Sequence, residues 1–127
     1  MNWQPITRGK PQVRGVHPTY RGLLEVVVEL DRRPPDGWAQ CFDHPEGVGM
    51  SLSMHPPRLS GGTIYLMPPD GEVEQYMAHI DERIRAANTS YEQRILPQVR
   101  AAEVVKQQAA DEEQRRLTEA RRKLEGL

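Results

Sequence analysis

Alternating apolar and polar residues dominate the first half of the chain. In Leu23–Leu30, the side chains of Leu24, Val26 and Val28 fall on one face, and charged residues interrupt the other. A period of two with three valines predicts a β-strand with one buried face. The Pro-Pro-Asp-Gly sequence at 34–37 then predicts a turn, because proline presets φ and glycine permits the return.

Three more short segments show strand-like patterns, and a fifth lies near the N-terminus. The predicted strands after the first are Trp38–Phe42, Gly49–Met54 and Thr63–Met67, and the loop 55–62 precedes the last of them. Short strands joined by turns most simply form an antiparallel meander. We therefore expect a four-stranded sheet over residues 22–67. A further short strand is expected near Gln12–Val16.

From Gly71 the spacing of apolar residues changes to that of a helix. Asp70 is the expected N-cap, and Glu72 and Glu74 suit the N-terminal end of the helix dipole. The apolar positions follow at steps of three and four, which keeps them on one face: Val73, Met77, Ile80, Ile84, Ala87 and Tyr91. This pattern predicts a helix that covers the sheet.

Pro97 divides the helical half of the chain. Because proline lacks an N–H and its ring collides with the preceding turn, we expect a kink near this residue. Beyond it the apolar positions are sparse among many charges, which is typical of a helix that pairs with another helix. The candidate interaction residues are Val99, Val105, Leu117, Leu124, Leu127, Arg116 and Arg122.

These patterns define an α+β fold class with three parts. A four-stranded antiparallel β-meander is covered by a helix, and a long charged C-terminal helix, kinked near Pro97, follows. Residues 1–20 form an extended basic arm rich in proline and glycine, 21–96 the α+β core domain, and 97–127 the charged helix, a candidate coiled coil.

Composition supports a modest core with a large solvated part. Of 127 residues, 37% are apolar, 6% aromatic and 28% charged, and the net charge is −1. This balance implies no bulk attraction to nucleic acid or to an anionic membrane. The first 33 residues nevertheless carry six basic and three acidic side chains. A basic arm with Trp3 and Tyr20 leaves accessory nucleic-acid binding open as an alternative, though not the favoured one.

Cysteine usage and the N-terminal segment indicate a compartment. Cys41 is the only cysteine, so no intrachain disulfide can form. The chain begins without the apolar core of a targeting signal, and no apolar run approaches the ~20 residues of a membrane span. A cytoplasmic protein with no membrane partner is the expectation.

Reactive side chains gather in one place, at Cys41, Asp43 and His44. A metal site needs three or four convergent ligands, and Cys41 with His44 supplies two. A nucleophilic cysteine needs a base within hydrogen-bond reach and a group that orients the base. The three residues keep a small enzyme or metal protein as an alternative. No catalytic or cofactor motif is present, and no cofactor is expected.

The favoured function is therefore a non-catalytic, cytosolic protein–protein interaction or assembly module. The thin apolar face of residues 98–127 has no evident use inside a single small domain. We expect the chain to bind a protein partner or itself, as a homo-oligomer, through the C-terminal helix or a sheet edge.

Overall fold

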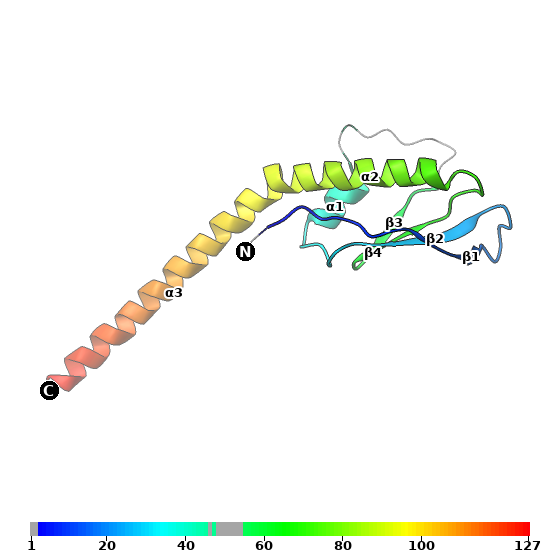
Figure 1. The fold of residues 1–127 in the computed structure, drawn as a ribbon. Helices are drawn as coiled ribbons and strands as arrows, with labels where there is room; N and C mark the ends of the chain where they lie inside the picture. Colours follow the sequence, from blue (N-terminus) through cyan, green and yellow to red (C-terminus); the bar gives the residue numbers. More distant parts are fainter. Residues whose placement is uncertain (1–2, 46, 48–54) are drawn as a thin grey trace.

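The computed structural model describes residues 3–45, 47 and 55–127, and it shows a small sheet-and-helix domain from which one long helix projects (Figure 1). The elements in chain order are β1 (Gln12–Val16), β2 (Leu24–Glu29), α1 (Trp38–Asp43), β3 (Arg58–Ser60), β4 (Thr63–Leu66), α2 (Val73–Ser90), a π-helical turn (Tyr91–Ile95) and α3 (Leu96–Glu125). The predicted α+β fold class is confirmed.

The four strands form one antiparallel sheet in the order β1-β2-β4-β3. The predicted strands at Leu23–Leu30 and Thr63–Met67 are confirmed as β2 and β4, and the strand at Gln12–Val16 is confirmed as β1. The order differs from a simple meander, because β4 pairs with β2 and places β3 at the outer edge.

The predicted strand at Trp38–Phe42 is wrong, because these residues form α1. Trp38 and Phe42 are four residues apart, a spacing that puts two side chains on one face of a strand and also on one face of a helix. Their rings stack at a centroid distance of 5.6 Å, and both are fully buried. The predicted strand Gly49–Met54 lies outside the described residues. Part of the expected loop 55–62 instead forms the strand β3.

Gly37 precedes α1 and shows why glycine is needed there. Its φ of +92° lies in the left-handed region, where a side chain is strained. A Cβ at this position would also lie 2.9 Å from Cδ1 of Ile95. The chain therefore turns into α1 directly against the end of the π-helical turn.

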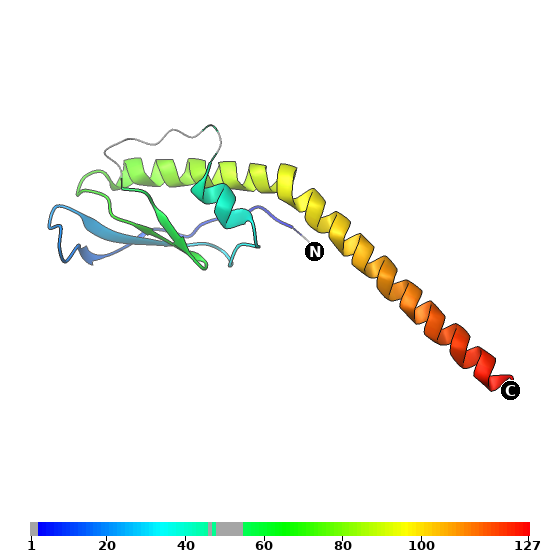
Figure 2. The same ribbon diagram turned by 180° about the vertical axis from the view of Figure 1, so that it is seen from behind.

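The core lies between one sheet face and the helices α1 and α2. Figures 1 and 2 show α2 running along the sheet, with α1 beside it. Val26, Val28 and Ile64 from the sheet meet Ile80 and Ile84 of α2, as the helical spacing predicts. The opposite sheet face is more open, and Tyr65 there is 41% exposed.

The start of α2 differs from the prediction. The helix begins at Val73 with Glu72 at the N-cap and no side-chain capping bond, so Asp70 is not the cap. Backbone bonds explain the difference: the Leu24 N–H donates to the Pro68 carbonyl, and Leu23 forms a bridge with Pro69. This segment extends the pairing with β2, and a turn at Gly71 (φ +89°) must intervene before the helix.

Helical hydrogen bonding is irregular at Tyr91–Ile95, one turn before Pro97. The Leu96 N–H donates to the Tyr91 carbonyl, which is the five-residue spacing of a π turn. Pro97 sits in the first turn of α3 and would otherwise meet the Gln93 carbonyl. The ribbon changes direction between α2 and α3 (Figure 1). A kink at Pro97 itself stays a prediction.

Candidate interaction surface

The long helix α3 leaves the domain and is solvated on all sides. Every residue from Ala101 to Leu127 is exposed, whereas Leu96 at its start is buried. Figures 1 and 2 show the helix projecting from the end of α2 in both views. From Ala101 onward the described helix contributes no buried residue to the core.

The N-terminal arm binds to the part of α2 that precedes the π turn and α3. Asn88 Oδ1 accepts hydrogen bonds from the Ile6 N–H at 2.9 Å and from Trp38 Nε1 at 2.9 Å. Its Nδ2 donates to the Ile6 carbonyl at 3.0 Å. Arg8 also pairs with Asp81 through both carboxylate oxygens. The arm, α1 and α2 are therefore joined just before the π turn.

An aromatic stack lies at the π turn itself. Tyr91 is fully buried, and Trp3 packs on its ring at 4.6 Å. Trp3 Nε1 donates to the Glu92 carboxylate at 2.8 Å, and the Arg32 guanidinium lies 5.4 Å from the Trp3 ring. These contacts fix the turn from which α3 departs, so α3 has a defined origin on the domain.

The Tyr91 hydroxyl has no hydrogen-bond partner among the described residues, although it is buried. Burial raises the pKa of Tyr91 above its ordinary value of 10.0, and the carboxylates of Asp36 and Glu103 act in the same direction. Both effects favour the neutral phenol. The hydroxyl thus adds polarity to the core without a compensating bond.

Replacement of Tyr91 by phenylalanine should therefore leave stability unchanged or raise it by up to about 1 kcal/mol at neutral pH, because an unsatisfied buried group is removed. Above about pH 10 the unfolded tyrosine ionises while the folded one stays neutral, so the folded wild type loses stability as pH rises. The Tyr91→Phe variant should not show the part of this alkaline loss of stability that comes from ionisation of Tyr91. Urea unfolding at neutral and alkaline pH measures both effects, with Tyr65→Phe as the exposed control. A loss of more than 1 kcal/mol at neutral pH would show that the hydroxyl has a partner.

A second buried polar contact joins α1 to α2. The Arg83 side chain is 4% exposed; Nε and one terminal nitrogen donate to the Phe42 carbonyl at 3.0 and 2.7 Å. The guanidinium also lies 4.7 Å from the Phe42 ring. Burial lowers the pKa of Arg83, and the Asp43 carboxylate opposes this shift. Arg83 thus satisfies the C-terminal end of α1, a structural role.

The candidate reactive residues lie on α1 and directly after it. Cys41 is half-buried within α1, while Asp43 and His44 are exposed at its end. Among the described residues, no group of three or more histidine, cysteine or acidic side chains is placed to hold a metal ion. The position of Cys41 near Tyr91 makes it part of the α1–α2 packing.

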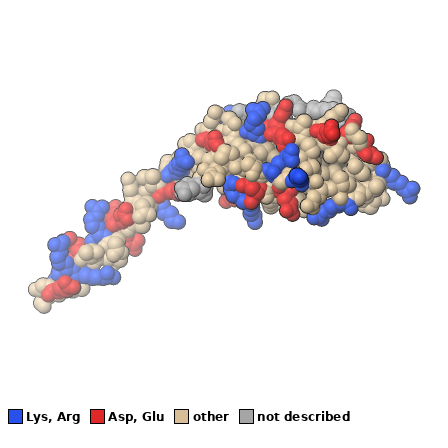
Figure 3. All heavy atoms as spheres, viewed as in Figure 1, with Lys and Arg blue, Asp and Glu red and all other residues tan. Residues whose placement is uncertain are grey.

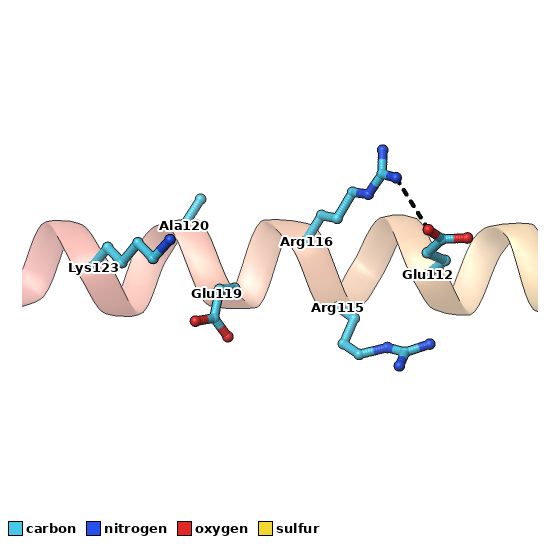
Figure 4. Close-up of a pocket in the computed structure, with 6 residues that line it drawn as sticks. All are labelled: Glu112, Arg115, Arg116, Glu119, Ala120 and Lys123. Atoms are coloured by element: carbon cyan, nitrogen blue, oxygen red, sulfur yellow. Dashed lines mark hydrogen bonds and ion pairs between the residues drawn. The ribbon is translucent and has the colours of Figure 1, made fainter.

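Six residues on the outer part of α3 border an open groove (Figure 4): Glu112, Arg115, Arg116, Glu119, Ala120 and Lys123. All of them come from one helix, so the groove has no opposing wall. Glu112 bonds to Arg116 at 3.0 Å, and Glu119 to Arg122 at 3.3 Å. Such pairs contribute about 0.2–0.5 kcal/mol each to an isolated helix. The groove is one side of a solvated helix.

The predicted interaction residues are all on α3 or just beyond it, and they do not all share one side. At about 100° per residue, Val99, Leu117 and Leu124 fall together, whereas Val105 and Arg116 lie roughly a quarter to a third of a turn away on one side. Arg122 points away on the other side, and Leu127 follows the end of α3. Acidic and basic side chains alternate along the projecting helix (Figure 3). The apolar side is therefore narrow and is bordered by charges of both signs.

The outer face of the sheet offers another exposed surface. A hollow there is bordered by residues of all four strands and the segments that flank them, among them Arg14, His17, Glu25, Arg58 and Tyr65. His17 Nδ1 accepts bonds from the backbone N–H groups of Thr19 and Tyr20, which leaves Nε2 as its donor. This surface is polar at its rim and apolar at its floor, where Val27 is buried.

Comparison of the chain with models of protein families, with curated proteins and with solved structures found no match. In the described part of the chain, no helix combines the length and apolar character needed to cross a membrane. The exposed helix α3 is thus the feature of the fold that most needs a functional explanation.

Proposed function

We propose that this protein is a non-catalytic, cytosolic assembly module that self-associates through α3. The observation that carries the proposal is the exposure of every residue from Ala101 to Leu127 in a helix that continues unbroken to Glu125. Isolated helices are marginal in water, and most helices in proteins are stabilised by packing of an apolar face. The described part of the domain does not cover the apolar face of α3 beyond Ala101.

Exposed apolar residues favour a helical partner. Leu117 is 45% exposed and Leu124 69% exposed, and both lie on the same side of α3. A narrow apolar side flanked by charges is the surface that helical pairs bury. A charged rod of this kind also resists nonspecific aggregation, since only one side offers apolar contact. We take a second copy of the chain as the partner, because other copies are available wherever the protein is made.

The test compares two single substitutions in the full chain. Leu117→Glu places a charge on the apolar side, and Val104→Glu places the same charge on the opposite side of α3, where Val104 is 56% exposed. Sedimentation equilibrium over a dilution series should show self-association of the wild type and of Val104→Glu. Leu117→Glu should be shifted toward monomer by at least about tenfold in Kd, which corresponds to roughly 1.4 kcal/mol.

Circular dichroism keeps this comparison interpretable. Both variants should retain the folded domain, because neither position contacts it. A wild type that remains monomeric at every concentration would end the proposal. Equal effects of the two substitutions would show that the apolar side of α3 is not the contact surface.

A further inference from the structure

One side of the final helix has a mirrored arrangement of residues. At steps of three or four, its positions are Ile95, Val99, Ala102, Lys106, Ala109, Glu113, Leu117, Ala120 and Leu124. At about 100° per residue, they stay within roughly 80° of arc on a straight helix. We call these nine positions the α3 stripe. If the positions are paired from the two ends inward, Ile95 with Leu124 and so on, the centre of the pairing falls between Ala109 and Ala110.

Mirroring about that centre matches the large side chains of Val99 and Leu117 with alanines. An antiparallel second helix would place Val99 opposite Ala120, and Ala102 opposite Leu117. Near the centre, Ala109 of one copy would meet Ala110 of the other. Large and small residues on facing positions allow two helices to interdigitate at close distance. In a parallel pair each alanine would instead face its own copy, which leaves the layers at Ala102 and Ala120 underpacked.

The charged residues of the α3 stripe also favour the antiparallel orientation. Lys106 and Glu113 are the only charged members of the α3 stripe. Antiparallel pairing puts Lys106 opposite Glu113 twice, once on each side of the two-fold axis. Parallel pairing would put Lys106 against Lys106 and Glu113 against Glu113, so both contacts would be repulsive. The stripe therefore discriminates between the two orientations by charge as well as by size.

We propose that two copies of the chain pair antiparallel through the α3 stripe, centred at Ala109 and Ala110. This inference rests on the proposed self-association and adds its partner, orientation and register. The paired segment runs from Val99 to Ala120, about 33 Å of helix at 1.5 Å per residue. The two folded domains then lie at opposite ends, and Leu124 of the second copy reaches the turn that carries Ile95.

The fold leaves room for this arrangement. The segment that pairs is exposed from Ala101 onward, so pairing along this part of α3 displaces no described part of the domain. Ile95 already packs against the core, and pairing accordingly begins at Val99. An isologous two-fold contact also closes on itself, which gives a dimer and not an open polymer.

Charge reversal tests the orientation. In the antiparallel dimer, Lys106→Glu or Glu113→Lys alone creates two repulsive contacts, and each should weaken dimerisation by about tenfold in Kd. The double variant Lys106→Glu with Glu113→Lys restores both opposite-charge contacts and should return the Kd to within about twofold of wild type. In a parallel dimer each single reversal leaves a like-charge pair at the changed position, and the double variant gives no rescue.

Cysteine cross-linking tests the register. In a Cys41→Ser background, Ala109→Cys lies at the two-fold centre and should form an interchain disulfide under mild oxidation. Ala102→Cys and Ala120→Cys lie away from the centre, so neither should cross-link to its own copy. A chain with Ala102→Cys and Leu117→Cys together should cross-link, because these two positions face each other. The disulfide bond needs an added oxidant, such as oxidised glutathione, which takes up the two electrons and two protons.

The outcomes separate this inference from the proposal on which it rests. Cross-linking at Ala102, Ala109 and Ala120 alike would establish a parallel dimer, which overturns the orientation while self-association survives. A dimer that none of the α3 variants affects would place the contact elsewhere. A monomer in sedimentation equilibrium would overturn both.

Discussion

Replacement of Trp38 by alanine is expected to cost about 4 kcal/mol of the free energy of unfolding. Trp38 is fully buried between the sheet and α2, and its ring stacks on Phe42. Large-to-small substitution of a buried aromatic residue removes its transfer free energy and leaves a cavity, which together cost about 3–5 kcal/mol. Its indole also donates to Asn88 at 2.9 Å, so the change leaves that acceptor with one fewer donor.

The loss is measured by urea unfolding followed by far-ultraviolet circular dichroism, which does not depend on the deleted fluorophore. Because domains of this size are stable by only about 5–15 kcal/mol, the variant should unfold at much lower urea. Tyr65→Ala is the matched control: it removes an aromatic ring from the open sheet face, where the side chain is 41% exposed. A Trp38→Ala cost below 1 kcal/mol would contradict the packing described for α1.

The second large effect is expected at Asn88. Its side-chain amide makes three hydrogen bonds, two to the backbone of Ile6 and one to Trp38. Alanine leaves the Ile6 N–H, the Ile6 carbonyl and the Trp38 N–H without these partners. Each such group costs about 1 kcal/mol or more when it stays shielded from water, so a total near 3 kcal/mol is expected.

Asn88→Ala should also free the N-terminal arm before the domain unfolds. Amide hydrogen exchange at Ile6 and the fluorescence of Trp3, which stacks on Tyr91, report the arm directly. Thr89→Ala is the matched control, because the next residue of α2 is exposed. Retained protection at Ile6 in Asn88→Ala would mean that the arm's other contacts, among them Arg8 with Asp81 and Trp3 with Tyr91, suffice to hold it in place.

The sequence predicted those elements whose apolar spacing is unambiguous. Val26 and Val28 of β2 and the face of α2 that includes Ile80 and Ile84 are buried as expected. Trp38 and Phe42 misled the prediction because a four-residue spacing fits a helix and a strand equally well. The two-residue Gly61-Gly62 connection between β3 and β4 is a hairpin signal, although it lies within the expected loop 55–62.

The candidate surface was foreseen in outline only. The charged, weakly apolar character of residues 98–127 pointed outward, but helical continuity to Glu125 is needed before residues can be assigned to sides of a rod. Arg122 illustrates the point, because its basic charge suggested a contact while its place in the helix turns it away from Leu117. The anchoring residues Asn88 and Arg83 carry no local sequence signal, since their partners are 41–82 residues distant.

The π turn at Tyr91–Ile95 determines how α3 is rotated about its axis relative to α2. In the sequence, the apolar spacing of α2 continues through Tyr91 to Ile95 as if the helix were uniform. A π turn accommodates one more residue than an α turn, so it rotates everything that follows by about 100° relative to a continuous α-helix. The direction in which α3 presents its apolar side is thereby set by the π turn, where Trp3 packs on Tyr91 and donates a hydrogen bond to Glu92. A one-residue deletion within this turn would change the direction in which the two domains of a pair face, while leaving the contacts along the helices themselves intact.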